Sequence, residues 1–164
     1  MGLDMYLSKR TYVRNWDHMA PEEQHTITVV GPEAGHIKPE RISYIEEQVA
    51  YWRKANAIHQ WFVTTCQDGV DDCRLAYVSR ASLVELRNLC AQLVSLHETD
   101  PLEADRRAAD VLPPSKGFFF GSQALDGYYW ADLRETADVL DRLLAEPGDT
   151  VRNCAHSFWY QSSW

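Results

Sequence analysis

The sequence predicts an α+β fold in a single domain, in which a small, mostly antiparallel sheet packs with about three main helices. Short segments with alternating apolar residues occur near both ends of the chain. Longer segments with apolar residues at helical spacing lie between them, and strands and helices do not alternate regularly. The chain has 164 residues, 45% of them hydrophobic and 24% charged, which is typical of a globular domain with one core. We therefore treat residues 1–164 as one domain.

The first third of the chain contains the first predicted strands. Apolar residues alternate at Leu3, Met5 and Leu7, the pattern of a half-buried strand, and residues 11–16 either continue that strand or return beside it. A second strand is expected at "HTITVV" (25–30), which is rich in β-branched residues. The following ten residues contain two glycines and two prolines and predict a loop.

A helix is predicted from Ile42 to Thr64. At 100° per residue, Tyr51, Ile58 and Phe62 fall on one line of this helix. This apolar line is expected to pack on the sheet.

The middle of the chain predicts a short strand and two helices. Residues 73–79 ("CRLAYVS") have the composition of a strand. The segment 82–96 repeats leucine at helical spacing, and Ser82 with Glu85 matches a capping box. Asp100 followed by Pro101 predicts the cap and first residue of a further short helix.

The last third is expected to form a loop, a helix and a strand. The segment "LPPSKGFFFGS" (112–122) reads as a loop that leads into or contains a strand. Asp126 is the predicted cap of a helix that runs to about Glu146. The aromatic tail, residues 151–164, predicts a final strand.

Charge and composition exclude several classes of function. The net charge of −8 opposes binding to a phosphate backbone, so general nucleic-acid binding is not expected. No apolar run is long enough to span a bilayer, and the first ten residues lack a signal-peptide pattern. These features predict a soluble, cytoplasmic protein. The cysteines lack metal-site spacing, so reduced thiols and no metal site are expected; they are Cys66, Cys73, Cys90 and Cys154.

The segment "YWRKANAIHQWF" (51–62) is the strongest candidate for a ligand site. On the predicted helix, hydrogen-bond donors form one stripe beside flat ring systems, a combination that suits the phosphates and base of a nucleotide-like ligand. The structural alternative is that these polar groups bond to a loop or to neighbouring strands. Two residues of the last strand are further candidates for lining the pocket. The predicted ligand-binding residues are Trp52, Arg53, Asn56, His59, Gln60, Tyr160 and Gln161.

Familiar catalytic motifs are absent from the sequence, so no catalytic residue and no cofactor are predicted. An enzyme that cleaves a phosphodiester or glycosidic bond is an alternative, with His59 as acid/base and Asp71 or Asp72 assisting. A Cys154–His156 pair lacks a third partner at a known spacing. The acidic turn "DGVDDC" lacks the spacing of a calcium loop.

Several islands of the sequence resemble a group of small uncharacterised bacteriophage and prophage proteins. The islands are "GLDMYL", "YWRKANAIHQWF", "DDC", "GFFFG" and "YQSSW". The resemblance implies a phage accessory protein in the bacterial host cytoplasm, one that counters host defence. It carries no catalytic residues over to this chain.

Two ways of countering host defence are consistent with this resemblance. One is sequestration of a small anionic, nucleotide-like signal molecule, and the other is inhibition or bridging of a host protein. The aromatic content predicts a homo-oligomer whose interface uses "GFFFG" or the C-terminal strand.

Overall fold

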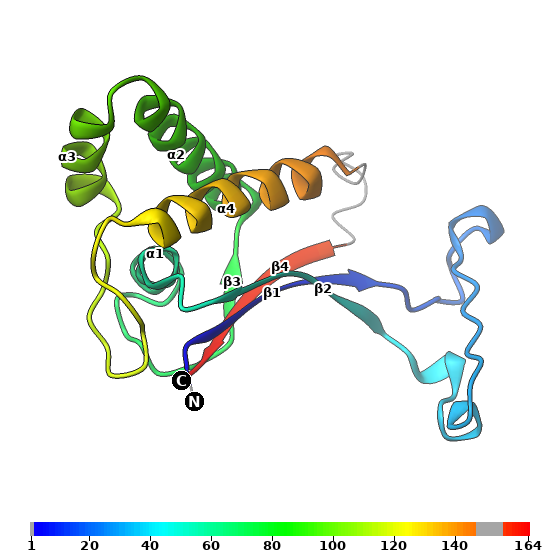
Figure 1. Cartoon of the computed structure of the whole chain (residues 1–164). Helices are drawn as coiled ribbons and strands as arrows, with labels where there is room; N and C mark the ends of the chain where they lie inside the picture. The colour runs from blue at the N-terminus through cyan, green and yellow to red at the C-terminus, as the bar shows by residue number, and fades with distance from the viewer. Residues whose placement is uncertain (1, 147–155) are drawn as a thin grey trace.

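A four-stranded antiparallel sheet joins the two ends of the chain (Figure 1). The computed structural model describes residues 2–146 and 156–164. The strands lie in the order β2-β1-β4-β3, so the N-terminal and C-terminal strands are neighbours at the centre. The elements are β1 (Asp4–Tyr12), β2 (Tyr44–Arg53), α1 (Asn56–Cys66), β3 (Ala76–Val78), α2 (Arg80–Thr99), α3 (Pro101–Val111), α4 (Gly127–Ala145) and β4 (His156–Ser163).

The predicted strands at the two ends of the chain are confirmed. Leu3, Met5 and Leu7 are fully buried, as their alternation predicted. Leu7 lies opposite Tyr160 of β4, which is also fully buried. Of the predicted final strand, residues 151–155 lie outside the described part of the chain.

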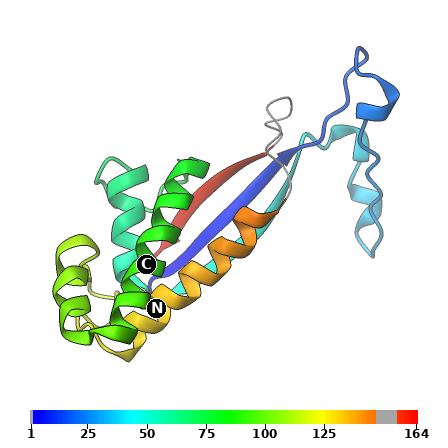
Figure 2. The same ribbon diagram turned by 90° about the horizontal axis from the view of Figure 1, so that it is seen from above.

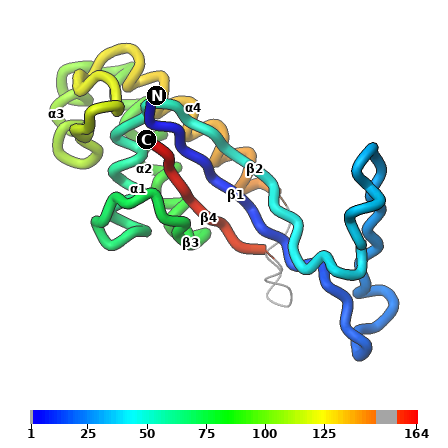
Figure 3. Tube along the Cα trace, turned by 90° about the horizontal axis from the view of Figure 1, so that it is seen from below, coloured from blue at the N-terminus to red at the C-terminus, as the bar shows by residue number. Residues whose placement is uncertain are grey.

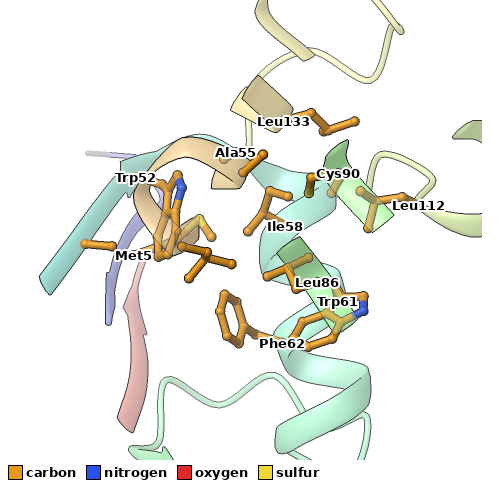
Figure 4. Packing of buried hydrophobic residues seen from close by; sticks show 14 of the residues in the cluster. Met5, Trp52, Ala55, Ile58, Trp61, Phe62, Leu86, Cys90, Leu112 and Leu133 are labelled. Atoms are coloured by element: carbon orange, nitrogen blue, oxygen red, sulfur yellow. The ribbon is translucent and has the colours of Figure 1, made fainter. Parts of the chain in front are cut away.

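The four described α-helices lie on one face of the sheet (Figures 1 and 2). Ile58 and Phe62 of α1 are fully buried in the core, beside side chains of the sheet, α2 and α4 (Figure 4). Phe62 stacks on Tyr160 with 4.1 Å between the ring centroids. The α+β prediction and the packing of Ile58 and Phe62 in the core are therefore confirmed. The prediction for Tyr51, the third residue of that line, is wrong, because Tyr51 lies in β2 and is 43% exposed.

Three of the predicted helices begin near the expected residues. Asp100 accepts a hydrogen bond from the backbone N–H of Glu103 at the start of α3. Asp126 caps α4 in the same way. The capping residue of α2 is Ser79 rather than Ser82, and its hydroxyl accepts from the Ser82 N–H. The helix gains almost a turn because Ser79 offers an equivalent capping oxygen three residues earlier.

The predicted helix from 42 to 64 is wrong over its first half. Residues 44–53 form β2, an edge strand paired antiparallel with β1, and α1 begins only at Asn56. A bulge between Leu7 and Ser8 shifts the register of this pair. These residues form a strand instead of a helix because pairing with β1 satisfies their backbone hydrogen-bonding groups. The alternate residues Ala50 and Trp52 are then buried in the core. The sequence contains no glycine or proline at the junction to mark the change.

The second strand predicted at residues 25–30 is also wrong. Residues 13–43 project beyond the end of the sheet (Figure 1) and contain three short 3-10 turns. Within this segment only Val13 is buried, so the β-branched residues have no core to pack against. The turns are Pro21–Glu23, Ala34–His36 and Pro39–Arg41.

Candidate functional site

A cavity of about 370 Å³ lies where β2 passes into α1 and where α4 begins. One wall comes from the β2–α1 junction and the first turn of α1, and the other comes from residues 121–133. Its volume lies in the range of small-molecule sites. The lining residues with functional groups are Arg53, Lys54, Asn56, Ser122, Asp126, Tyr128, Tyr129 and Asp132.

Two consecutive cationic residues form one side of the cavity. The Arg53 side chain is 60% exposed, and its Nε lies 3.9 Å from an Asp4 carboxylate oxygen. Lys54 adopts a left-handed backbone conformation with a φ of 62°, which costs a non-glycine residue free energy. Its side chain runs past Gly121, where an added Cβ would meet the Lys54 Cβ at 3.3 Å. The fold therefore holds both side chains at the cavity.

The first turn of α1 adds partial positive charge to the same wall. Residues 55–58 all line the cavity. Ala55 is the N-cap and makes no side-chain capping bond, and the first turn contains no acidic residue. The positive end of the helix dipole is thus not compensated by a cap or an acid of its own first turn. This wall favours an anionic group of a ligand.

Asn56 lines the cavity, but its amide group is already used. The Nδ2 group donates to the carbonyl oxygens of Phe120 at 2.9 Å and Ser122 at 2.7 Å. The Oδ1 atom accepts from the Ser115 N–H at 3.1 Å. Asn56 therefore ties residues 115–122 to the start of α1. It shapes the cavity wall and has little capacity left to bind a ligand.

The opposite wall is acidic and aromatic. Asp132 is largely buried, and burial together with the nearby carboxylates of Glu135 and Asp126 raises its pKa to about 7. The Tyr128 ring is 81% exposed. Asp126 is occupied as the cap of α4, accepting from the N–H groups of Tyr128 and Tyr129. Asp132 is thus a half-buried carboxyl group with a raised pKa that faces the cavity.

His59 lies one turn further along α1 and is not among the residues that line the cavity. Its Nδ1 lies 2.8 Å from the Tyr160 hydroxyl and its Nε2 lies 2.9 Å from an Asp71 carboxylate oxygen. An ionised carboxylate only accepts hydrogen bonds, so Nε2–H donates to Asp71. Burial strongly raises the pKa of Tyr160, so its hydroxyl keeps the proton and donates to Nδ1. The indole N–H of Trp164 donates to the other Asp71 oxygen at 3.1 Å.

This His59 cluster is closed to a substrate. His59 and Tyr160 are both fully buried. Asp72 bonds instead to the Arg74 N–H at 3.2 Å. The arrangement links α1 to the loop before β3 and to β4, and offers no reacting group at the cavity. Of the alternative Cys154–His156 pair, Cys154 lies outside the described residues.

The structure places the remaining predicted residues away from the cavity. Trp52 is in the core, where its Nε1–H donates to the Thr136 hydroxyl at 3.0 Å. Gln60 donates to Thr64 at 3.1 Å. Gln161 donates to the carbonyl oxygen of Cys73 at 3.1 Å. Of the seven predicted residues, Arg53 and Asn56 line the cavity. The five that do not line it are Trp52, His59, Gln60, Tyr160 and Gln161.

Sequence reasoning missed Lys54, Tyr128 and Asp132. Only the strand-to-helix junction brings Lys54 beside Arg53 at one wall of the cavity. Tyr128 and Asp132 are four residues apart on α4 and so share a helix face. That spacing is visible in the sequence, but nothing local shows which face meets a cavity.

The described residues, 2–146 and 156–164, include no candidate metal cluster and no candidate membrane span. In these ranges no group of three or more His, Cys, Asp or Glu side chains is arranged to hold a metal ion. None of the described helices combines the length and apolarity required to cross a bilayer. Comparison of the chain with models of protein families, with curated proteins and with solved structures returned no match.

Proposed function

We propose that this protein binds a small nucleotide-like ligand in the cavity between β2, α1 and α4, and holds it without changing it chemically. The observation that carries the proposal is the meeting of Arg53, Lys54 and the uncapped first turn of α1 at one cavity of about 370 Å³. An arginine fork and a helix N-terminus both favour phosphate oxygens. Together they supply a local positive site on a chain whose net charge is −8.

The acidic wall supports a ligand with two different ends. Asp126 and Asp132 would repel a phosphate group, so the phosphate belongs at Arg53 and Lys54. A base edge with N–H donors suits the Asp132 carboxylate, because a carboxylate accepts hydrogen bonds from such edges. The exposed ring of Tyr128 offers a surface on which a base can stack. A nucleotide carries all three of these groups.

Binding without catalysis is favoured by the chemistry of the lining. No histidine or cysteine is present among the residues that line this cavity. The buried cluster of His59, Tyr160 and Asp71 has its nitrogen and hydroxyl groups paired. The enzyme alternative based on His59 is therefore not favoured.

The biological setting is part of the same proposal. The sequence islands that resemble phage and prophage proteins suggest action in the cytoplasm of a bacterial host. A binding protein with an anion site would counter defence there by sequestering a nucleotide signal. Inhibition of a host protein remains the competing hypothesis, and it requires no ligand in the cavity.

Titration calorimetry with cyclic mononucleotides and cyclic dinucleotides tests this proposal, because their phosphodiesters keep a constant charge between pH 6 and 8. Arg53→Ala should weaken binding by about 1.5–3 kcal/mol, the scale of a charge-assisted hydrogen bond. Arg53→Lys should restore only part of the loss, since an ammonium cannot form the bidentate contact. Ligand released by heating should be recovered intact.

Two controls separate binding from structure. Arg106→Ala removes an exposed arginine on α3, outside the cavity lining, and should leave affinity unchanged. Thermal melts should show little change in Arg53→Ala, because its ion pair with Asp4 is long and exposed. Unchanged affinity in folded Arg53→Ala, or no binding by any nucleotide of the panel, would refute the proposal. Recovery of a cleaved ligand would favour an enzyme.

A further inference from the structure

The face of the sheet opposite the helices carries six aromatic side chains. We call this the outer face. It consists of the strand residues that alternate with buried residues such as Met5, Leu7, Trp52 and Phe158. Figure 3 shows the strands from this side, with the described helices behind them. The aromatic residues are Tyr6, Tyr12, Tyr44, Tyr51, Tyr77 and Trp159.

These aromatic residues form cross-strand pairs over the length of the sheet. The ring centroids of Tyr6 and Tyr51 are 5.5 Å apart. Those of Tyr12 and Tyr44 are 5.1 Å apart at the far end of β1. Tyr77 meets Trp159 at 5.9 Å on the other edge. The rings therefore form three pairs on one face of the sheet, with polar strand residues such as Ser8 and Gln48 between them.

The outer face is also electrically balanced. Its charged residues form two pairs, Arg10 with Glu46 at 2.5 Å and Arg53 with Asp4 at 3.9 Å. The Arg10 guanidinium lies over the Trp159 ring, 5.0 Å from its centroid. The four charges sum to zero, whereas the whole chain carries −8. The excess negative charge therefore lies elsewhere on the molecule.

An antiparallel sheet with one solvated face normally presents polar residues on that face. Tyr44, Tyr51 and Tyr77 are instead exposed aromatic residues. Tyrosine, tryptophan and arginine are the residue types enriched at protein interfaces. Three aromatic pairs gathered on one solvated sheet face indicate an interaction site.

We propose that the outer face packs against the same face of a second copy of this chain. The ion pairs lie at opposite ends of β1, with Asp4 at its start and Arg10 near its end. A two-fold axis that lies in the plane between the two faces, perpendicular to β1, places each ion pair of one copy over the other ion pair of its partner. Each pair carries both signs, so the contact is self-complementary.

The neutral charge of the outer face favours a second copy over a nucleic acid. A neutral face imposes no like-charge repulsion where the two copies touch, and charges further away are screened over about 8 Å at physiological salt. The nine residues of β1 make the face about 30 Å long at ~3.3 Å per residue. A nucleic acid would require net positive charge, which this face lacks.

Sedimentation equilibrium of the full chain between 1 and 100 μM tests the proposal. The unmodified protein should have twice the mass of 18.9 kDa. Combining Tyr44→Glu with Tyr77→Glu should raise the dimer dissociation constant at least a hundredfold, because both changes bury charge against a neutral aromatic surface. Both residues lie outside the cavity lining, whereas Arg53 belongs to the cavity and to the outer face. Nucleotide binding by the double variant therefore tests the proposed function separately from this dimer.

Phe118→Glu is the matched control. Phe118 is 94% exposed in the loop before α4 and is not one of the strand residues that make up the outer face, so its variant should remain a dimer. Circular dichroism and thermal melts should show that all variants are folded. A mass of 18.9 kDa for the unmodified protein at 100 μM would overturn the proposal. A dimer that persists in the Tyr44→Glu and Tyr77→Glu double variant would also overturn it, as would dissociation of the dimer by Phe118→Glu. A monomer that uses Tyr44 and Tyr77 to bind an oligonucleotide or another protein would overturn it as well.

Discussion

The first turn of α1 and the turn that follows it both carry polar side chains, yet their surroundings differ. At His59 both ring nitrogens have partners, and the ring is fully buried. At the first turn, Ala55 makes no side-chain cap, and Arg53 and Lys54 line a cavity. Asn56 shares a feature with each region: it lines the cavity, as Arg53 does, but its amide group is already hydrogen-bonded, as the His59 ring is.

The difference shows how a structural polar group is told apart from a binding group. Buried polar atoms that are fully paired stabilise the fold and have nothing left for a ligand. Cationic groups that are weakly paired at a cavity keep that capacity. Polar residues that lie a few positions apart in the sequence are therefore expected to have different roles, His59 in stability and Arg53 in ligand binding. Four substitutions test this contrast through the free energy of unfolding.

The largest effect is expected for His59→Ala. The change creates a void in the core and leaves the buried Tyr160 hydroxyl without its partner, so the free energy of unfolding should fall by about 3–4 kcal/mol. Urea unfolding measures this loss. The neighbouring Gln60→Ala removes only an exposed bond to Thr64 and should cost less than about 0.5 kcal/mol. Equal effects of the two changes would contradict the structural role of His59.

Asn56→Ala should be the next most destabilising change. It removes three hydrogen bonds to residues 115–122, and the free energy of unfolding should fall by about 2–3 kcal/mol. Hydrogen exchange at the Ser115 N–H should become faster, because that group loses its acceptor. Ser122→Ala is the control, because it removes bonds of an exposed hydroxyl to the Ala124 N–H and to Asp126 and keeps all three bonds of Asn56. Unchanged exchange in Asn56→Ala would show that the loop is held by other contacts.

Asp132 should make stability depend on pH. Its folded-state pKa of about 7 lies above the ordinary value, so the folded state binds more protons between about pH 4 and 7. The stabilisation by the neutral carboxyl is present at low pH and is lost as pH rises through 7. Asp132→Asn should therefore unfold less readily at pH 8, by about 1–2 kcal/mol after allowance for solvent screening.

Denaturant unfolding at pH 5 and pH 8 checks the prediction for Asp132. The gain from Asp132→Asn should be clearly smaller at pH 5 than at pH 8, because the stability of the native protein falls progressively as pH rises from the unfolded pKa of about 4 to the folded pKa of about 7. Asp138→Asn, an exposed change on the same helix, should give no such difference between the two pH values. A gain of equal size at both pH values would show that charge on Asp132 is not the cause.

The smallest effect is expected for Lys54→Gly. The left-handed backbone at Lys54 suits glycine, so the free energy of unfolding should rise by about 0.5–1 kcal/mol. Lys54→Ala keeps the backbone cost and should give no gain. Both variants lack the ammonium group and should bind the nucleotide more weakly than the native protein. A gain in Lys54→Ala equal to that in Lys54→Gly would indicate that the side chain, not the backbone, destabilises the fold.

The local sequence pattern was sufficient to predict the elements that depend on neighbouring residues alone. The alternation of Leu3, Met5 and Leu7 predicted β1, because one face of the strand is buried. Asp100 and Asp126 predicted the starts of α3 and α4, since a capping carboxylate satisfies N–H groups within the same turn. The α+β class and the antiparallel sheet followed from these elements. Arg53 and Asn56 were also found at the level of sequence.

Tertiary contacts decided the rest. Residues 44–53 have apolar spacing that fits a helix, yet pairing with β1 makes them a strand. That change separates Trp52 from the candidate site and brings Lys54 beside Arg53 at the cavity. The pairing of His59 with Tyr160, 101 residues away, cannot be read from local spacing. The sequence by itself determined which segments have polar and apolar faces, and only the packing of distant segments decided which polar groups are paired and which stay open.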